Sequence, residues 1–174
     1  MSLIIEEITR NHDRKIFDCG IGELNRFLQQ QARQKSVKHI SKTYVACQES
    51  LSKTITGYYT LTGYSVTVPP AHQYYQKYPH PLSAVKLARL AVATSYQGQR
   101  LGEMLLIDAI YRTVLVADQI STIGLFVDPM MAAVVSFYEQ YGFCLAYPED
   151  ETKLDMWLPI ETCIELASTL AKTP

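Results

Sequence analysis

From Val85 to Gly102 the sequence reads VKLARLAVATSYQGQRLG. The first eight residues are mostly apolar and long enough for a buried strand, and a helical pattern follows the stretch to about Asp118. Gln97–Gly102 connects the two and carries two glycines, so several backbone N–H groups and a helix N-terminus meet there. Such a turn is typical of an anion site for phosphates, although it also occurs as a plain connection. It is neither a Gly-x-Gly-x-x-Gly dinucleotide motif nor a Gly-Lys-Ser/Thr loop.

The composition is that of an ordinary globular chain of 174 residues, 48% hydrophobic and 19% charged, and this length predicts one domain. Sixteen basic and seventeen acidic side chains give a net charge of −1, which excludes a strongly basic nucleic-acid coat but not a local basic patch. The four cysteines form no Cys-x-x-Cys pair, so reduced, mostly buried thiols are expected. No leader and no membrane-spanning run is recognisable, which predicts a cytoplasmic protein without a membrane partner.

Periodicity in the first half predicts two strands that form a hairpin, one earlier strand and one helix. The strands are expected at Ile4–Ile8, Lys42–Cys47 and Thr54–Leu61, the hairpin turn at Gln48–Lys53, and the amphipathic helix from Glu23 to about Gln34. Residues 62–83 contain Pro69, Pro70, Pro79 and Pro81 among tyrosines. Since proline cannot continue a central strand, we expect a loop or insertion there, at the rim of a site.

The second half predicts strands that alternate with helices. Further strands are expected at Val85–Val92, Thr122–Val127, Phe143–Tyr147 and Leu154–Leu158, and helices from Gly102 to about Asp118, from Asp128 to Tyr141 and from Glu161 to Ala171. Gly142 is well placed to end the middle helix. Runs of strands with two helices between the later ones predict a mixed α/β or α+β sheet rather than a regular parallel winding.

A second motif, Phe137-Tyr138-Glu139-Gln140-Tyr141-Gly142-Phe143, lies about forty residues beyond the glycine turn. Together with Leu90-Ala91-Val92 and Gln97–Gly102 it resembles the GCN5-related N-acetyltransferases, the GNAT superfamily. The resemblance implies that family's α/β (α+β) fold, a central mixed, mostly antiparallel sheet flanked by helices. It also implies one domain over residues 1–174, with an insertion at about 62–83 and a short C-terminal extension at about 160–174.

The same resemblance implies an enzyme that uses acetyl-coenzyme A. The residues that match the family's coenzyme A motifs are Leu90, Ala91, Val92, Gln97, Gly98, Gln99, Arg100, Leu101, Gly102, Phe137 and Tyr138. Leu90 and Val92 are expected to act through backbone N–H groups in a splayed strand, which can hydrogen-bond the thioester oxygen and the pantetheine amides. Arg100 departs from the family pattern, which has glycine there, so its side chain must point outward or reach the pyrophosphate.

Tyr138 is the predicted catalytic residue. The family uses a tyrosine at this position to protonate the departing thiolate. A phenol with an ordinary pKa of about 10 is protonated at neutral pH and can serve as that acid. The alternative is an aromatic anchor between helix and sheet, as expected of Phe137 and Phe143. No dedicated base is required, because a good fraction of an aminoacyl amine is already neutral, and Glu139 is expected to be a solvated surface charge.

The chain is most similar to one GNAT subfamily, the acetyltransferase toxins of bacterial toxin–antitoxin pairs, which acetylate the free amine of aminoacyl-tRNA. The matching segments, in chain order, are Phe17-Asp18-Cys19-Gly20, Leu24-Asn25-x-Phe27-Leu28, Thr43-Tyr44-Val45, Gly57-Tyr58-Tyr59 and Leu87–Val92. This resemblance implies aminoacyl-tRNA as the substrate, a ribbon-helix-helix antitoxin as a partner, and a homodimer.

A basic segment is the candidate RNA surface. Arg26–Lys42 contains no acidic residue, and the predicted substrate contacts are Arg33, Lys35, Lys38, Lys42 and Arg89. Tyrosines that could stack on an unpaired base are Tyr44, Tyr58, Tyr59, Tyr74, Tyr75 and Tyr78. The alternative interpretation is a solvated helix face, and for Arg89 a surface residue whose charged end reaches into solvent.

Two other functions remain open at this point. The chain could acetylate a small-molecule or protein amine, or it could be a regulatory module that keeps coenzyme A for structure and acts on DNA through its antitoxin. The four histidines, His12, His39, His72 and His80, show no ligand spacing, so no metal is expected.

Overall fold

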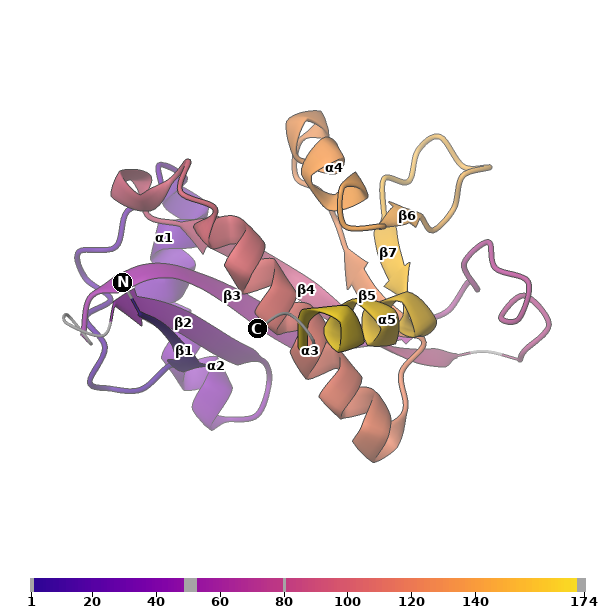
Figure 1. Ribbon diagram of the computed structural model, residues 1–174, viewed down its shortest axis with the longest axis horizontal. Coiled ribbons are helices and arrows are strands. Elements are labelled where there is room, and N and C mark those ends of the chain that lie inside the picture. Colours follow the sequence, from indigo (N-terminus) through magenta and orange to yellow (C-terminus); the bar gives the residue numbers. More distant parts are fainter. Residues whose placement is uncertain (1, 49–52, 80, 172–174) are drawn as a thin grey trace. The chain divides into compact units, whose positions relative to one another are not determined.

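The computed structural model describes residues 2–48, 53–79 and 81–171. In chain order the elements are β1 (Leu3–Glu7), α1 (Gly22–Phe27), the π-helical turn η1 (Leu28–Ala32), α2 (Arg33–Val37), β2 (Lys42–Gln48), β3 (Ile55–Val66), β4 (Leu82–Val92), the 3-10 turn η3 (Thr94–Tyr96), α3 (Leu101–Ile120), β5 (Gly124–Val127), α4 (Ala132–Glu139), β6 (Cys144–Leu145), β7 (Met156–Pro159) and α5 (Ile160–Ala171), labelled in Figure 1.

The strands follow the order β1-β2-β3-β4-β5-β7-β6 in one sheet. The pairs β1–β2, β2–β3, β5–β7 and β6–β7 are antiparallel, whereas β4 and β5 pair in parallel. The prediction of a mixed, mostly antiparallel sheet flanked by helices is confirmed. No helix within 2–48, 53–79 and 81–171 is long and apolar enough to cross a membrane.

The chain divides into two compact units, one made of residues 1–62 with 88–109, the other of 63–87 with 110–174. The expectation of a single domain over the whole chain stays a prediction.

In the first unit, helices cover both faces of the hairpin of β2 and β3, and β3 shows why. Tyr58 is fully buried; it donates a hydrogen bond to the carbonyl oxygen of Leu24 at 2.8 Å and stacks on Phe27 of α1. Gly57 faces the other way, because successive strand residues alternate. A Cβ on Gly57 would lie 2.9 Å from Leu105 Cδ1 and 3.1 Å from the carbonyl oxygen of Ala91. Glycine therefore lets the first half of α3 pack directly on the strand.

The predicted helix from Glu23 is present, but it is not α-helical throughout. Leu24, Leu28, Ala32 and Ser36 are all buried and lie four residues apart. In an α-helix of 3.6 residues per turn, each such step rotates the side chain by about 40°, so four of them cannot share one face. The wider π-helical turn over Leu28–Ala32 removes this drift and keeps the row against the sheet.

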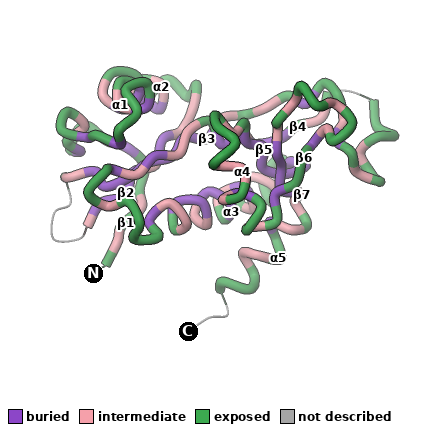
Figure 2. Tube along the Cα trace, turned by 90° about the horizontal axis from the view of Figure 1, so that it is seen from above, coloured by how far each residue is buried: buried purple, intermediate pink, exposed green. Residues whose placement is uncertain are grey.

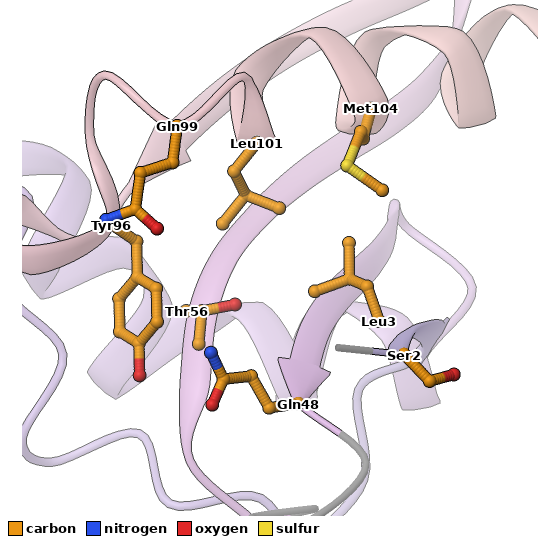
Figure 3. Close-up of a pocket in the computed structure, with 8 residues that line it drawn as sticks. All are labelled: Ser2, Leu3, Gln48, Thr56, Tyr96, Gln99, Leu101 and Met104. Carbon is orange, nitrogen blue, oxygen red and sulfur yellow. The ribbon is translucent and has the colours of Figure 1, made fainter.

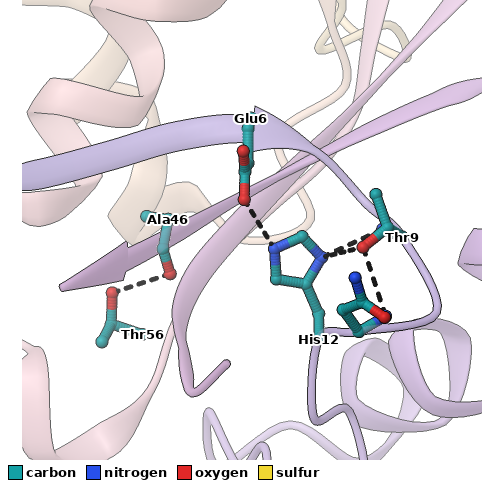
Figure 4. Close-up of polar contacts among 6 residues, drawn as sticks. Glu6, Thr9, His12, Ala46 and Thr56 are labelled. Carbon is teal, nitrogen blue, oxygen red and sulfur yellow. Dashed lines mark hydrogen bonds and ion pairs between the residues drawn. The ribbon is translucent and has the colours of Figure 1, made fainter. Parts of the chain in front are cut away.

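His12 fastens the segment after β1 (Figure 4). The backbone N–H of Thr9 donates to His12 Nδ1 at 2.9 Å, so the ring proton lies on Nε2, which donates to Glu6 Oε1 at 3.0 Å. The ring is 5% exposed. Both nitrogens are therefore used in holding β1 and its following turn together.

The core of the second unit forms around Trp157 of β7. Its ring packs against Phe126 of β5 at 5.3 Å between centroids and meets Tyr75 and His72 edge-on. Two residues of the proline-rich segment, His72 and Tyr75, thus pack on this core, whereas Tyr74 and Tyr78 of the same segment are exposed. α5 packs on β5 and β7 through buried Cys163, and its later residues are exposed (Figure 2).

The largest differences between expected and observed boundaries are at the end of β3 and at the start of α4. β3 continues to Val66, because Thr62, Tyr64 and Val66 alternate with more exposed residues as in a strand. The described residues between β3 and β4 are therefore 67–79 and 81, a shorter segment than the expected 62–83. α4 begins at Ala132 instead of Asp128, since Asp128 forms an ion pair with Lys86 and Met131 is extended. Most of the expected hairpin turn, residues 49–52, lies outside the described residues, as does His80.

Candidate functional site

The turn before α3 contains two residues in the left-handed region. Gly98 has φ of 72° and Arg100 has φ of 63°. Glycine adopts this region freely, whereas an L-residue does so at a cost, because its Cβ crowds the backbone. The usual glycine of the GNAT pattern at the position of Arg100 thus has a conformational reason, and Arg100 adopts the same conformation without being glycine.

The turn leaves backbone donors ahead of the helix. The first hydrogen bond that α3 makes within itself runs from the N–H of Met104 to the carbonyl oxygen of Arg100, at 3.2 Å. The N–H groups from Arg100 to Glu103 precede this ladder and have no partner inside the helix. They lie at the positive end of the helix dipole, which suits the phosphates of coenzyme A.

Hydrogen bonds to backbone carbonyl oxygens of neighbouring segments hold this turn in place. Gln97 Nε2 donates to the carbonyl oxygens of Val92 at 3.0 Å and Cys19 at 3.2 Å, and the N–H of Thr94 donates to the carbonyl oxygen of Asp18 at 2.9 Å. The Gln97 side-chain amide therefore hydrogen-bonds within the protein and stabilises the conformation of the turn.

The segment Phe17–Gly20 provides two of the carbonyl oxygens that accept these hydrogen bonds, those of Asp18 and Cys19. Asp18 Oδ1 accepts hydrogen bonds from the N–H of Gly20 and from Asn25 Nδ2, both at 2.8 Å. These two bonds lower the pKa of Asp18, because they favour the charged carboxylate. Asn25 Oδ1 in turn accepts from the N–H of Cys19 at 2.9 Å. The loop before α1 is thereby shaped to meet the end of β4.

Leu90 and Val92 direct their backbone N–H groups away from β3. The N–H of Ala93 donates to the carbonyl oxygen of Thr56 in the direction of β3, at 2.9 Å. Because successive N–H groups along a strand point to opposite edges, those of Val92 and Leu90 point to the other edge. The parallel pairing of β4 with β5 involves Val85, Lys86 and Leu87. It therefore ends before Leu90 and Val92.

A pocket of about 300 Å³ lies beside the turn in the first unit. Its lining includes Tyr96 of η3, Gln99 of the turn, and Leu101 and Met104 of α3 (Figure 3). Leu3, Gln48 and Thr56 of strands β1, β2 and β3 line it as well, together with Ser2 just before β1. The side chains of Gln99 and Leu101 face this pocket. If these two residues bind an anion at the turn Gln97–Gly102, we therefore expect them to do so through their backbone N–H groups.

Tyr138 lies on α4 in the second unit and is 5% exposed. Its ring contacts Phe137 at 5.2 Å and Phe143 at 5.4 Å between centroids. Burial raises the pKa of Tyr138 to about 12, so the phenol is protonated throughout the physiological range. α4 ends at Glu139, two residues before the predicted end at Tyr141, and Gly142, with φ of 91°, follows the turn after it. Glu139 is exposed, as expected of a surface charge.

Two of the five predicted substrate cations meet on one aromatic ring. The Arg89 guanidinium lies 3.8 Å from the centroid of Phe27, and Lys35 Nζ lies 5.5 Å from it. Lys42 is different, since its Nζ forms an ion pair with Glu7 Oε1 at 2.7 Å. Arg33 Nε is buried without a hydrogen-bond partner among the described residues, and Lys38 is exposed at the end of α2.

Of the six proposed stacking tyrosines, two are fully buried and two are largely exposed, whereas Tyr44 and Tyr75 are intermediate. Tyr58 and Tyr59 are fully buried, and Tyr59 hydrogen-bonds Asp108 of α3. They cannot stack on a base, and that expectation was wrong because these rings fill the core between sheet and helices. Tyr74 and Tyr78 are more than half exposed.

Sequence reasoning missed Phe27 and Glu103. Phe27 is the platform shared by Lys35 and Arg89, and this could not be read from the sequence because Arg89 is 62 positions away in the chain. Glu103 pairs with Arg100, and the spacing of three residues at a helix start could have revealed it.

Comparison with known proteins agrees with this geometry. Residues 39–144 match the acetyltransferase (GNAT) domain family. The chain is 31% identical over 128 residues to a tRNA-acetylating toxin of Mycobacterium tuberculosis, covering 73% of this chain and 75% of that protein. It is 26% identical over 170 residues to a probable toxin TacT of Sinorhizobium fredii, covering 91% and 92%.

Solved structures show the same fold. AtaT complexed with acetyl-methionyl-tRNAfMet gives a TM-score of 0.84 at 29% identity, covering 95% of this chain and 98% of that one. AtaTR bound with acetyl-coenzyme A gives 0.81 at 27%, covering 94% and 97%. A Tyr-to-Phe variant of AtaT bound to the C-terminus of the antitoxin AtaR gives 0.79 at 27%, covering 94% and 97%.

This chain belongs to the GNAT acetyltransferases. Within that class it is similar to the tRNA-acetylating toxins. The predictions of the fold, of an acetyltransferase and of acetyl-coenzyme A as the acetyl donor are confirmed.

Proposed function

We propose that this acetyltransferase acts on the amino group of aminoacyl-tRNA and blocks translation as the toxin of a toxin–antitoxin pair. One observation carries the proposal. The same compact unit holds the turn Gln97–Gly102 before α3, which we call the phosphate turn, and a basic pair, Lys35 and Arg89, on the ring of Phe27. A cation held over a ring lies at a fixed position, which suits contact with an RNA backbone. The names of the relatives point to the same substrate.

The cofactor contacts follow from the turn. The backbone N–H groups from Arg100 to Gly102 bind the pyrophosphate, and Gly98 allows the chain to turn towards it. Gln97 keeps the turn attached to Val92, and Gln99 and Leu101 contribute their backbone. Phe137, next to Tyr138 on α4, contributes an apolar wall for the cofactor.

The N–H groups of Leu90 and Val92 bind the thioester oxygen and the pantetheine amides, with Ala91 buried between them. An N–H that points at a carbonyl oxygen stabilises the negative charge that grows there when the amine attacks. Because β4 is paired to β3 on its other edge, these N–H groups are already oriented before the amine attacks.

The reaction balances with one proton. The neutral amine attacks the thioester carbon, the C–N bond forms, and the C–S bond breaks to leave a thiolate. The attacking nitrogen loses a proton as the sulfur gains one. Tyr138 is the proton donor to sulfur, and the proton from nitrogen restores the phenol.

The raised pKa of Tyr138 limits how this transfer can occur. A phenol with a pKa of about 12 is a weaker acid than a thiol, whose pKa is about 8.5, so complete transfer to sulfur alone would be uphill by about 5 kcal/mol. Tyr138 therefore donates a strong hydrogen bond to the sulfur and gives up its proton only as the ammonium proton replaces it.

We place this enzyme in the cytoplasm, as one domain that forms a homodimer and is held inactive by a ribbon-helix-helix antitoxin. AtaT in complex with the C-terminus of AtaR is the supporting precedent. Arg33, Lys38 and Lys42 extend the RNA surface from the platform on Phe27.

The test offers labelled acetyl-coenzyme A to the protein with three acceptors: total charged tRNA, the same tRNA after deacylation, and a mixture of free amino acids. We expect label on charged tRNA only. Transfer to the free amino acids at equal efficiency would replace the tRNA proposal by a small-amine acetyltransferase. Binding of coenzyme A without transfer to any acceptor would instead favour a regulatory module.

A further inference from the structure

Arg100 occupies a position where its backbone conformation favours glycine. Its φ of 63° lies in the left-handed region, one residue before α3 begins. A glycine there would avoid the crowding of Cβ against the backbone. The side chain is 81% exposed, so Arg100 does not pack into the protein.

What the side chain does is bind Glu103. Arg100 Nε lies 2.7 Å from Glu103 Oε2, and a second guanidinium nitrogen lies 3.4 Å from Glu103 Oε1. Both carboxylate oxygens therefore face one guanidinium. The Glu103 side chain is 24% exposed, which places the carboxylate closer to the protein than the arginine that covers it.

Glu103 lies in the first turn of α3, among the free N–H groups of the phosphate turn. In the absence of a ligand, a carboxylate at a helix N-terminus is favourable, because it faces the positive end of the dipole. For an anionic ligand at the same end, that carboxylate is repulsive. The charge of Arg100 cancels this repulsion.

We propose that Arg100 is a charge-compensating residue of the coenzyme A site, which neutralises Glu103 so that the N–H groups before α3 can attract a diphosphate. The inference rests on the proposed placement of coenzyme A at this turn. Arg100 thus acts through Glu103 as a positioning residue, and its own contact with phosphate is not needed.

A double-mutant cycle tests the proposal by binding rather than by activity. The dissociation constant of coenzyme A is measured by calorimetry for the parent, Arg100→Gly, Glu103→Gln and the double variant, at about 50 mM salt. We expect Arg100→Gly to weaken binding about 5- to 10-fold, Glu103→Gln to leave it equal or up to about 3-fold tighter, and the double variant to bind within about 2-fold of the parent. At about 500 mM salt the loss in Arg100→Gly should shrink, because surface charges are screened.

Two controls separate this effect from folding and from net charge. Arg100→Gly should unfold at the same temperature as the parent or higher, since glycine relaxes the left-handed backbone. Arg10→Gln removes one positive charge from an exposed turn and should leave the affinity for coenzyme A within about 2-fold of the parent.

Equal losses on removing Arg100 in the presence and absence of Glu103 would overturn the proposal, because the arginine would then act on the ligand directly. Unchanged affinity in Arg100→Gly would overturn it as well. Both outcomes leave the proposed function standing, since the parent still binds coenzyme A. A parent protein that binds no coenzyme A would overturn the proposed function itself.

Discussion

At the scale of single residues, burial determines what Tyr138 can do. The phenol is enclosed by Phe137 and Phe143, and its raised pKa keeps the proton in place. A residue that must give a proton at one moment and hold it otherwise benefits from this, provided that another proton arrives as the first one leaves.

Tyr138→Phe keeps the ring and removes the donor. We expect the turnover number to fall about 10²- to 10⁴-fold, the range for one positioned general acid, with little change in the Michaelis constant for acetyl-coenzyme A. Steady-state kinetics with charged tRNA measure both quantities. Tyr111→Phe, at a tyrosine 53% exposed on α3, is the matched control. A Tyr138→Phe enzyme with parental turnover would return Tyr138 to a packing role.

The basic side chains differ in whether a carboxylate neutralises them. Lys35→Gln and Arg89→Gln should each weaken tRNA binding about 3- to 10-fold and reduce the slope of log affinity against log salt by about 0.7 to 0.9. Lys42→Gln should have a smaller effect, because Glu7 already neutralises Lys42. Filter binding at several salt concentrations gives both numbers. Parental slopes in all three variants would identify this surface as a solvated helix face.

At the scale of elements, the contact between β3 and α3 depends on Gly57. The strand needs a residue without a side chain there, because Leu105 and the backbone of Ala91 occupy the space. This close approach fixes the start of α3 against the sheet, and with it the turn that precedes the helix.

Gly57→Ala should lower the free energy of unfolding by about 1–3 kcal/mol, the usual cost of overpacking. Gly63→Ala is the control in the same strand, since a Cβ there would meet nothing within 4 Å, and stability should be unchanged or slightly higher. Urea unfolding of both variants checks the difference. Equal stabilities would mean that α3 does not require this approach.

At the scale of the whole molecule, several buried acids have raised pKa values. Burial raises the pKa of Cys47 to about 11 and those of Cys163 and Tyr138 to about 12, and it also raises the pKa of Tyr58. In the unfolded chain these groups lose their protons near pH 9 for cysteine and 10 for tyrosine. Above those values the unfolded state binds fewer protons than the folded state.

The free energy of unfolding should therefore be constant below pH 9 with respect to these groups and decrease as the pH rises from about 9 to 12. Chemical unfolding at fixed temperature across this range measures the decrease. Tyr138→Phe should make the decrease shallower between pH 10 and 12, whereas Tyr111→Phe should leave it as in the parent. An identical slope in Tyr138→Phe would show that this phenol ionises as easily in the folded protein as in the unfolded chain.

The sequence by itself determined the features that depend on residues close together in the chain. Alternation predicted the strands, periodicity predicted the long helix after Gly102, and the two motifs identified the family. Local sterics govern these features, so a few residues suffice to specify them. The roles of the turn before α3 and of Tyr138 stay predictions.

Tertiary packing alone decided the rest. The four-residue spacing of Leu24, Leu28, Ala32 and Ser36 is resolved by a π-helical turn only because a sheet covers that row. Tyr58 and Tyr59 became core, and Lys35 and Arg89 met on Phe27, through contacts between residues far apart in the chain. Such contacts depend on which faces the folded elements bury, and no local pattern encodes the partner.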